Sequence, residues 1–180
     1  MKEQKQSMRE DKFDNIAPEI ALATILKRGG WTISTAESCT GGRIGAILTK
    51  HPGSSEFYKG SVVAYCNEVK KGVLGVKAET LDTEGAVSAS VVEQMSKGVL
   101  KLLNTDFAIA VSGIAGPDGG SKEKSVGMVW IAVADREEAK SRCYYFGSNR
   151  EQNMEKTVLE AIFFAKEFVE NKKDCTFAPR

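Results

Sequence analysis

The stretch Asp106-Phe-Ala-Ile-Ala-Val111 is apolar at every position after its first residue. A continuous apolar run of this length is typical of a β-strand that is covered on both faces of its sheet. The chain then passes directly into a segment rich in glycine. These two features predict a strand that crosses the interior and ends in a loop at the surface.

Helical and strand-like segments alternate before this strand, and two strands separated by a short charged turn follow it. Ser88 and Asn67 are expected to be the N-caps of two of the helices. The predicted helices span 16–28, 44–48, 68–74, 88–103 and 150–170, and the other predicted strands span 31–36, 61–65, 126–134 and 141–146. This order predicts an α/β fold, a three-layer α/β/α sandwich with a mixed, mostly parallel sheet and a late antiparallel hairpin. We expect a flexible polar leader over 1–13, a single domain over 14–171 and a polar tail over 172–180.

The charges and the cysteines exclude several function classes. Twenty-five Lys and Arg residues against 24 Asp and Glu residues leave a net charge of +1, too little to favour nucleic acid or an anionic membrane as a partner. No stretch approaches about 18 consecutive apolar residues, and the start lacks a signal-peptide core, so a cytoplasmic location is expected. The four cysteines lack metal-site spacing and predict reduced thiols, and His51 is the one histidine. A metal site and a Ser-His-Asp triad are therefore disfavoured.

The segment Thr35-Ala-Glu-Ser-Cys-Thr-Gly-Gly42 places hydroxyls between a predicted strand and a predicted helix. Ser38 would lie beside the free N–H groups of a helix N-terminus, which suits a nucleophile or a phosphate site. An equal alternative is that Ser38 and Thr40 only cap the helix. Cys39 is a rival nucleophile, ranked below Ser38, because a helix N-terminus lowers the pKa of a thiol.

A lysine follows the second predicted strand in Tyr65-Cys-Asn-Glu-Val-Lys70. Lys70 could be the general base for a serine if burial or a positive neighbour lowers its pKa from about 10.4 toward neutrality. On spacing alone, the more common alternative is that Lys70 and Lys71 form a solvated pair.

Glycine or proline occupies five of the ten positions from Ser112 to Ser121. The backbone amides of such a loop could hold a phosphate or a carboxylate beyond a strand end, although a plain long loop is the alternative. Neither the Walker A nor the GxGxxG pattern is present, so ATP and NAD gain no support. Arg150, at the start of the last predicted helix, could reach a phosphate with its guanidinium.

Five motifs taken together resemble the CinA C-terminal domain family. They are Thr35–Gly42, Pro52-Gly-Ser-Ser55, Tyr65–Lys70, Gly85-Ala-Val-Ser88 and Ser112–Gly120 with Val126-Gly-Met-Val-Trp130, in order over about residues 17–170. The resemblance implies nicotinamide mononucleotide deamidase activity, which yields nicotinate mononucleotide and ammonia in pyridine nucleotide salvage. The chain departs from the family pattern at Cys66, where Ser or Thr is more common, and at Ser125, where Pro is frequent.

Roles follow from the resemblance motif by motif. Ser38 would be the nucleophile, Lys70 its base, and Tyr65 a hydroxyl that moves a proton or holds the substrate. The implied substrate-binding residues are Thr40, Gly41, Gly42, Asn67, Ser112, Gly113, Ala115, Gly116 and Arg150. The resemblance implies a small nucleotide as substrate, no metal or cofactor, and a homo-oligomer.

Many members of this family carry a further N-terminal domain associated with pyrophosphatase activity. About 15 residues precede the first predicted helix, so no pyrophosphatase activity is expected. Two other function classes stay open: a nucleotide-binding module without catalysis that acts in a competence or DNA-damage response, and a structural assembly domain.

Overall fold

The computed structural model describes residues 16–176, with side chains described to residue 172. The leader predicted over 1–13 lies outside the described residues. The elements are α2 (Pro18–Gly29), β1 (Ile33–Glu37), α3 (Arg43–Leu48), η1 (Ser54–Glu56), β2 (Tyr58–Val63), α4 (Asn67–Gly72), α5 (Ala78–Glu84), α6 (Ala89–Leu103), β3 (Phe107–Gly113), β4 (Met128–Ala134), β5 (Ala139–Tyr145) and α7 (Arg150–Thr176).

The five strands form one sheet in the order β2-β1-β3-β4-β5. Strand β1 pairs in parallel with β2 and with β3, whereas β4 is antiparallel to both β3 and β5. Four strands therefore run in one direction and β4 runs against them. The predicted mixed sheet with a late antiparallel hairpin is confirmed; by neighbouring pairs, the sheet is half parallel.

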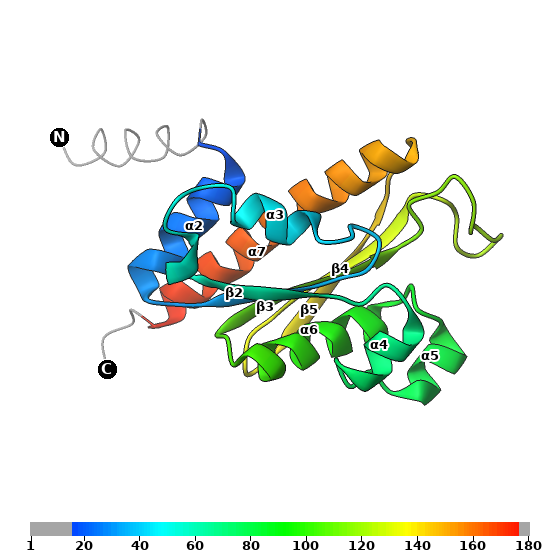
Figure 1. The fold of residues 1–180 in the computed structure, drawn as a ribbon, viewed down its shortest axis with the longest axis horizontal. Helices are drawn as coiled ribbons and strands as arrows, with labels where there is room; N and C mark the ends of the chain where they lie inside the picture. Colours follow the sequence, from blue (N-terminus) through cyan, green and yellow to red (C-terminus); the bar gives the residue numbers. More distant parts are fainter. Residues whose placement is uncertain (1–15, 177–180) are drawn as a thin grey trace.

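Helices cover both faces of the sheet, with α2, α3 and α7 on one side and α4, α5 and α6 on the other (Figure 1). Strand β3 supplies both cores by alternation, since Ile109 and Val111 pack with the α2–α7 layer and Ala108 and Ala110 pack with the α6 layer. The small alanines on the second face let α6 approach the sheet closely. The three-layer sandwich is therefore the observed architecture.

Helix α6 shows how local signals and packing agree. Its apolar face, which includes Val92, Met95 and Val99, is buried against the sheet. Ser88 is the N-cap, as predicted, and its hydroxyl accepts a hydrogen bond from the Val91 N–H at 3.4 Å. Asn104 ends the helix in the left-handed conformation with φ of 49°.

Several predicted boundaries are wrong. Strand β2 begins at Tyr58, three residues before the predicted start; Gly60 in this segment weakens the strand pattern in the sequence. Helix α4 has Cys66 as its N-cap, so Asn67 lies in the first turn and is not the cap. Helix α5 was not predicted, and α7 continues to Thr176, so its end takes up part of the predicted tail.

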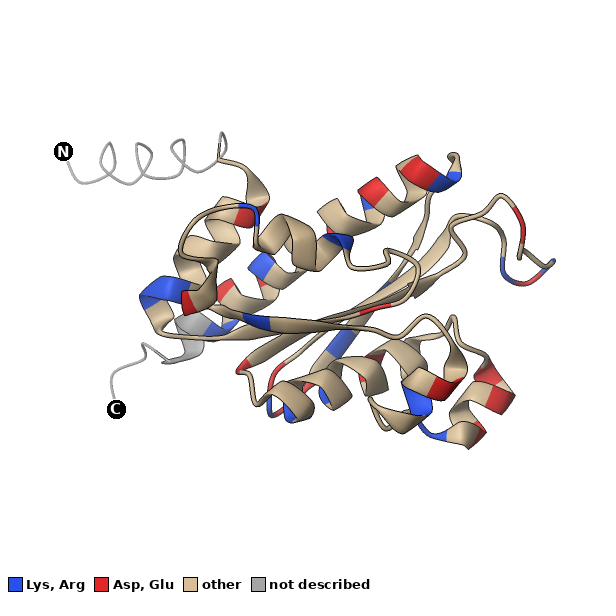
Figure 2. Cartoon of the chain, in the orientation of Figure 1, with Lys and Arg blue, Asp and Glu red and all other residues tan. Residues whose placement is uncertain are grey.

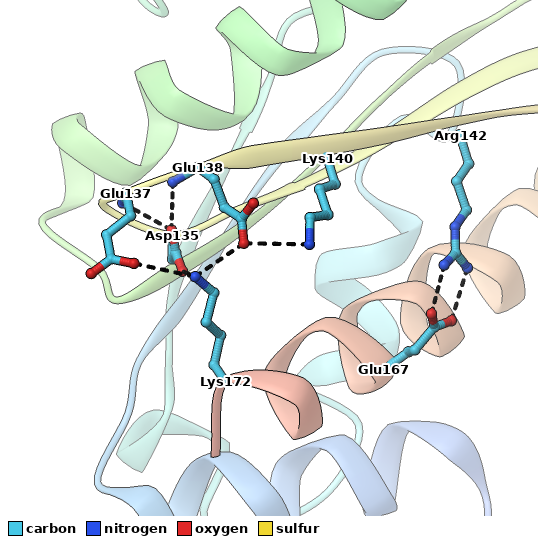
Figure 3. A network of polar contacts seen from close by, with 7 residues as sticks. All are labelled: Asp135, Glu137, Glu138, Lys140, Arg142, Glu167 and Lys172. Carbon is cyan, nitrogen blue, oxygen red and sulfur yellow. Dashed lines mark hydrogen bonds and ion pairs between the residues drawn. The ribbon is translucent and has the colours of Figure 1, made fainter. Parts of the chain in front are cut away.

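Ionic side chains join the end of α7 to the β4–β5 hairpin (Figure 3). The Lys172 ammonium lies 2.9 Å from the Asp135 carboxylate and 3.0 Å from that of Glu138. Arg142 forms a bidentate ion pair with Glu167. Elsewhere basic and acidic residues are interspersed over both helical layers (Figure 2). Between residues 16 and 176 no helix is long and apolar enough to cross a membrane.

The parallel pairing brings the carboxyl ends of β1, β2 and β3 to one edge of the sheet. The β4–β5 turn lies at the opposite edge, because Ala134 pairs with Ala108 near the start of β3. Ligands of open α/β sheets usually bind outside the carboxyl ends of parallel strands. This edge is also where the sequence places its candidate residues.

Candidate active site

Ser38 directly follows β1 and is held by backbone hydrogen bonds on both of its peptide groups. Its N–H donates to the Val111 carbonyl of β3 at 3.1 Å, and its own carbonyl accepts from the Gly41 N–H at 3.2 Å. The residue is 8% exposed. The side chain therefore leaves a tight turn that is fixed to the centre of the sheet.

Lys70 reaches Ser38 from α4, the helix that follows β2. Its Nζ lies 3.1 Å from Ser38 Oγ, 2.8 Å from the Ala64 carbonyl oxygen and 3.5 Å from the Tyr65 carbonyl oxygen. The lysine is 2% exposed. The structure thus brings Ser38 and Lys70 together, and the alternative of a solvated lysine pair is wrong for Lys70.

Burial lowers the pKa of Lys70 below the ordinary lysine range, although the neighbouring thiols and Glu68 act in the opposite direction. A neutral amine has two N–H bonds and one lone pair. The two backbone carbonyls accept the two protons, which leaves the lone pair for the hydroxyl of Ser38. The surroundings of Lys70 therefore suit an amine that takes a proton from serine.

Cys39 does not meet the requirement for a thiolate nucleophile. It is buried, and burial raises the pKa of its thiol to about 12. The expectation that the helix N-terminus lowers this pKa is therefore wrong, because loss of hydration outweighs the favourable local charges. Cys39, Cys66 and Cys143 are free thiols in the described part of the chain.

The carboxylate of Glu37, rather than a hydroxyl, accepts hydrogen bonds from the free backbone N–H groups at the start of α3. Its carboxylate accepts hydrogen bonds from the N–H groups of Gly42, Ile44 and Gly45 at 2.8–3.0 Å. The N-cap position is Gly42, and no side chain of the cap itself contributes. The alternative that Ser38 and Thr40 only cap the helix is therefore wrong.

This arrangement determines which backbone N–H groups near Ser38 are available to donate a hydrogen bond to a negatively charged oxygen. The Gly41 and Gly42 N–H groups already donate within the protein. Among the described residues, neither the Cys39 N–H nor the Thr40 N–H donates to another residue, and the Cys39 N–H meets only its own thiol. Among the amides of residues 39–42, those of Cys39 and Thr40 are therefore the two candidates for stabilising an oxyanion.

A cavity of about 240 Å³ contains the Ser38–Lys70 pair. Its lining is Ser38, Cys39, Tyr65, Asn67, Lys70, Ala86, Val87, Ser112, Gly113, Ala115 and Arg150. A second, more open hollow of about 580 Å³ adjoins it and shares Cys39, Tyr65 and Arg150. The predicted residues Thr40 and Gly41 line this outer hollow.

Arg150 connects two walls of the cavity. Its guanidinium donates to the Gly116 carbonyl at 2.6 Å and to the Tyr65 hydroxyl at 3.1 Å. The Tyr65 side chain is 62% exposed, and its hydroxyl contacts Arg150 rather than Ser38 or Lys70. The predicted residues Gly42 and Gly116 line neither hollow.

A larger hollow of about 680 Å³ lies along β5 and α7, at the opposite edge of the sheet. Its charged lining includes Arg142, Glu167 and Lys172, which are paired with one another or with the hairpin (Figure 3). No group of three His, Cys, Asp or Glu side chains that could bind a metal occurs among the described residues. The volume of a hollow therefore does not identify the candidate active site, whereas a buried nucleophile beside a base does.

Comparison with known proteins gives the family. The model for the CinA C-terminal domain matches residues 16–169. The chain belongs to this family. A CinA-like protein of Endomicrobium trichonymphae is 47% identical over 150 residues, which are 83% of this chain and 35% of that protein. A protein of Acetivibrio thermocellus, named putative competence-damage inducible protein, is 44% identical over 84% of this chain and 37% of its own length.

Solved CinA structures agree with the fold of this CinA domain. A CinA superfamily protein from Klebsiella pneumoniae superposes with a TM-score of 0.83 at 37% identity, covering 86% of this chain and 96% of that one. A competence/damage-inducible protein from Agrobacterium tumefaciens gives 0.79 at 40% identity, covering 83% and 93%. The CinA domain spans about a third of the length of the curated relatives.

Three features of the CinA domain's site were not predicted from the sequence. Ala86 and Val87 line the cavity, and the Ser112 hydroxyl donates to the Ala86 carbonyl at 2.7 Å. Asn153 on α7 is fully buried and donates to the Ala115 carbonyl at 3.0 Å. Glu37 holds α3. The motif Gly85–Ser88 was the one available signal for the first feature.

Proposed function

We propose that this CinA domain is an amidohydrolase that converts nicotinamide mononucleotide into nicotinate mononucleotide and ammonia. The observation that carries the proposal is the 3.1 Å contact between Lys70 Nζ and Ser38 Oγ inside a cavity. A buried lysine with a lowered pKa beside a serine hydroxyl is an arrangement for activating that serine. The choice of substrate derives from the family resemblance.

In the first half of the reaction, Ser38 Oγ attacks the carboxamide carbon while its proton passes to Lys70 Nζ. The carboxamide oxygen becomes an oxyanion, for which the free N–H groups of Cys39 and Thr40 are the candidate donors. The C–N bond then breaks, and Lys70 returns the proton to the leaving nitrogen, which departs as ammonia. An ester between Ser38 and the nicotinoyl group remains.

In the second half, Lys70 accepts a proton from water as the water oxygen attacks the ester carbon. The bond to Ser38 Oγ breaks, and Lys70 returns that proton to the serine. The nucleotide leaves with a carboxylic acid in place of its carboxamide, and this acid loses its proton to the solvent to become the carboxylate. One residue thus alternates between base and acid, and the enzyme ends in its starting protonation state.

The two adjoining hollows support a substrate with a small amide end and a polar extension. The inner cavity holds the Ser38–Lys70 pair, and the outer hollow is more open. Arg150 lies on both, and its planar fork is suited to a phosphate. We assign the carboxamide to the inner cavity and the ribose phosphate to the side of Arg150.

The test is ammonia release and product identity from nicotinamide mononucleotide, measured with EDTA present. We expect turnover by the natural protein and none by Ser38→Ala with unchanged thermal unfolding. A protein that shows no turnover, yet melts at higher temperature with the nucleotide, would instead be a binding module. Homo-oligomer formation and a cytoplasmic location stay predictions from the sequence.

A further inference from the structure

Glu37 is a fully buried carboxylate immediately before the candidate nucleophile. It lines neither hollow of the site, so it is not placed to touch a substrate. A buried carboxylate is costly unless its oxygens accept several hydrogen bonds. The contacts of Glu37 meet that requirement in a way that bears on Ser38.

Each oxygen of the Glu37 carboxylate accepts three hydrogen bonds. Oε2 accepts from the Thr40 hydroxyl at 2.7 Å and from the Gly42 and Ile44 N–H groups at 3.0 Å. Oε1 accepts from Gly45 N–H at 2.8 Å and from two hydroxyls, of Thr35 at 3.3 Å and Ser61 at 3.4 Å. An ionised carboxylate accepts on both oxygens, so all six contacts are satisfied together.

These contacts bridge the two ends of the turn that contains Ser38. The chain leaves β1 at Glu37, reverses through two glycines with φ of 60° and 99°, and begins α3 at Arg43. The Glu37 side chain joins the start of this turn to its end. Apart from these side-chain contacts, backbone hydrogen bonds hold the turn: the two of Ser38 itself and the one from the Arg43 N–H to the Thr40 carbonyl at 3.3 Å.

We propose that Glu37 is a positioning residue, whose carboxylate fixes the Glu37–Gly42 turn so that Ser38 Oγ stays within reach of Lys70 Nζ. This inference rests on the proposed function for its meaning, because it assumes that Ser38 attacks a substrate. It also explains why the first turn of α3 offers no anion site: the protein's own carboxylate occupies those amides. A substrate phosphate is left to the side of Arg150.

Glu37→Gln is the decisive variant because it keeps the length and shape of the side chain. Whichever way the amide is oriented, its NH₂ group meets at least one backbone N–H, which can only donate, so the turn loses part of its anchor. Asp135→Asn is the matched control. Asp135 is also buried and accepts from two backbone N–H groups, at the opposite edge of the sheet.

Two readouts separate this inference from the proposed function. The first is kcat and KM for ammonia release from nicotinamide mononucleotide across a range of pH. The second is the rate at which a fluorophosphonate probe labels Ser38, followed by mass spectrometry, which does not depend on that substrate. If the natural protein is labelled but does not turn over the nucleotide, the proposed function fails and the role of Glu37 is still tested.

We expect Glu37→Gln to lower both kcat and the labelling rate by on the order of 10- to 100-fold, with KM and the acid limb of the pH profile unmoved. Asp135→Asn should lower the melting temperature but label at the natural rate. Thr40→Val, which removes one of the six donors, should give a smaller loss in kcat than Glu37→Gln. Equal slowing in Glu37→Gln and Asp135→Asn, or an unchanged labelling rate in Glu37→Gln, would overturn the proposal.

Discussion

Gly98 on α6 lies against the backbone that follows α4, the helix that carries Lys70. A Cβ atom at position 98 would lie 2.0 Å from the Leu74 carbonyl oxygen and 2.8 Å from its carbon. Real contacts of this kind are not shorter than 3.0 Å, so Gly98→Ala must separate the two segments by about 1 Å. The obstacle is backbone, so no side-chain rotation relieves it.

The displacement would reach Lys70 through the hydrogen bonds of this segment. The Leu74 N–H donates to the Val69 carbonyl, and the Val76 N–H donates to the Lys70 carbonyl at 3.0 Å. Overpacking lowers the free energy of unfolding by about 1–3 kcal/mol. The higher helix propensity of alanine offsets about 1 kcal/mol of this loss. We therefore expect a net loss of about 0–2 kcal/mol in the free energy of unfolding.

We expect the catalytic cost of Gly98→Ala to be on the order of 10-fold in kcat, approaching 100-fold if the full shift reaches Lys70. Gly72→Ala is the control, because Gly72 ends α4 and a Cβ there meets nothing within 4 Å. It should raise stability by about 0.5 kcal/mol and leave kcat unchanged. Urea unfolding and ammonia release measure both effects. A Gly98→Ala protein as stable and as fast as Gly72→Ala would mean that the contact with Leu74 neither strains the fold nor moves Lys70.

Three other predictions follow from charged groups. The rate of ammonia release should rise with pH through the lowered pKa of Lys70, since only the neutral amine accepts a proton, and Lys70→Met should be inactive at every pH tested. Burial raises the pKa of Asp135, but the backbone N–H groups and Lys172 lower it more, so the pKa is below its ordinary value. The ionised carboxylate therefore stabilises the fold above the ordinary aspartate pKa, and this stabilisation is lost as pH falls through the lowered value. Asp135→Asn should flatten that acid dependence in thermal unfolding and cost about 1–3 kcal/mol at neutral pH. Arg150→Lys should raise KM for the nucleotide by roughly 10-fold or more, because an ammonium cannot replace two guanidinium hydrogen bonds; an unchanged KM would remove Arg150 from substrate binding.

The sequence predicted most of what depends on local pattern. The apolar run at 106–111 indicated a strand covered on both faces, and Ser88 marked the start of α6. The contact of Ser38 with Lys70, 32 residues apart, was foreseen only as a possibility. It depends on β1 and β2 lying side by side in parallel, which no local spacing specifies.

Tertiary contacts decided the features that the sequence did not reveal. No sequence pattern assigned Glu37 a partner, yet its partners are the amides of the helix that follows, together with hydroxyls of β1, the turn and β2. The pKa of Cys39 followed burial rather than the helix N-terminus. The start of β2 was missed because it contains Gly60, a residue type that is depleted in strands.

The central claim is that Ser38, activated by Lys70, attacks the amide carbon. The most direct test incubates the protein with nicotinamide mononucleotide, quenches in acid and searches by mass spectrometry for a nicotinoyl nucleotide ester on the peptide that contains Ser38. Lys70→Met and Ser38→Ala are run beside the natural protein. We expect ammonia release and a transient ester on Ser38 in the natural protein, and neither in the two variants. Full ammonia release by Ser38→Ala, with its thermal unfolding unchanged, would contradict this claim.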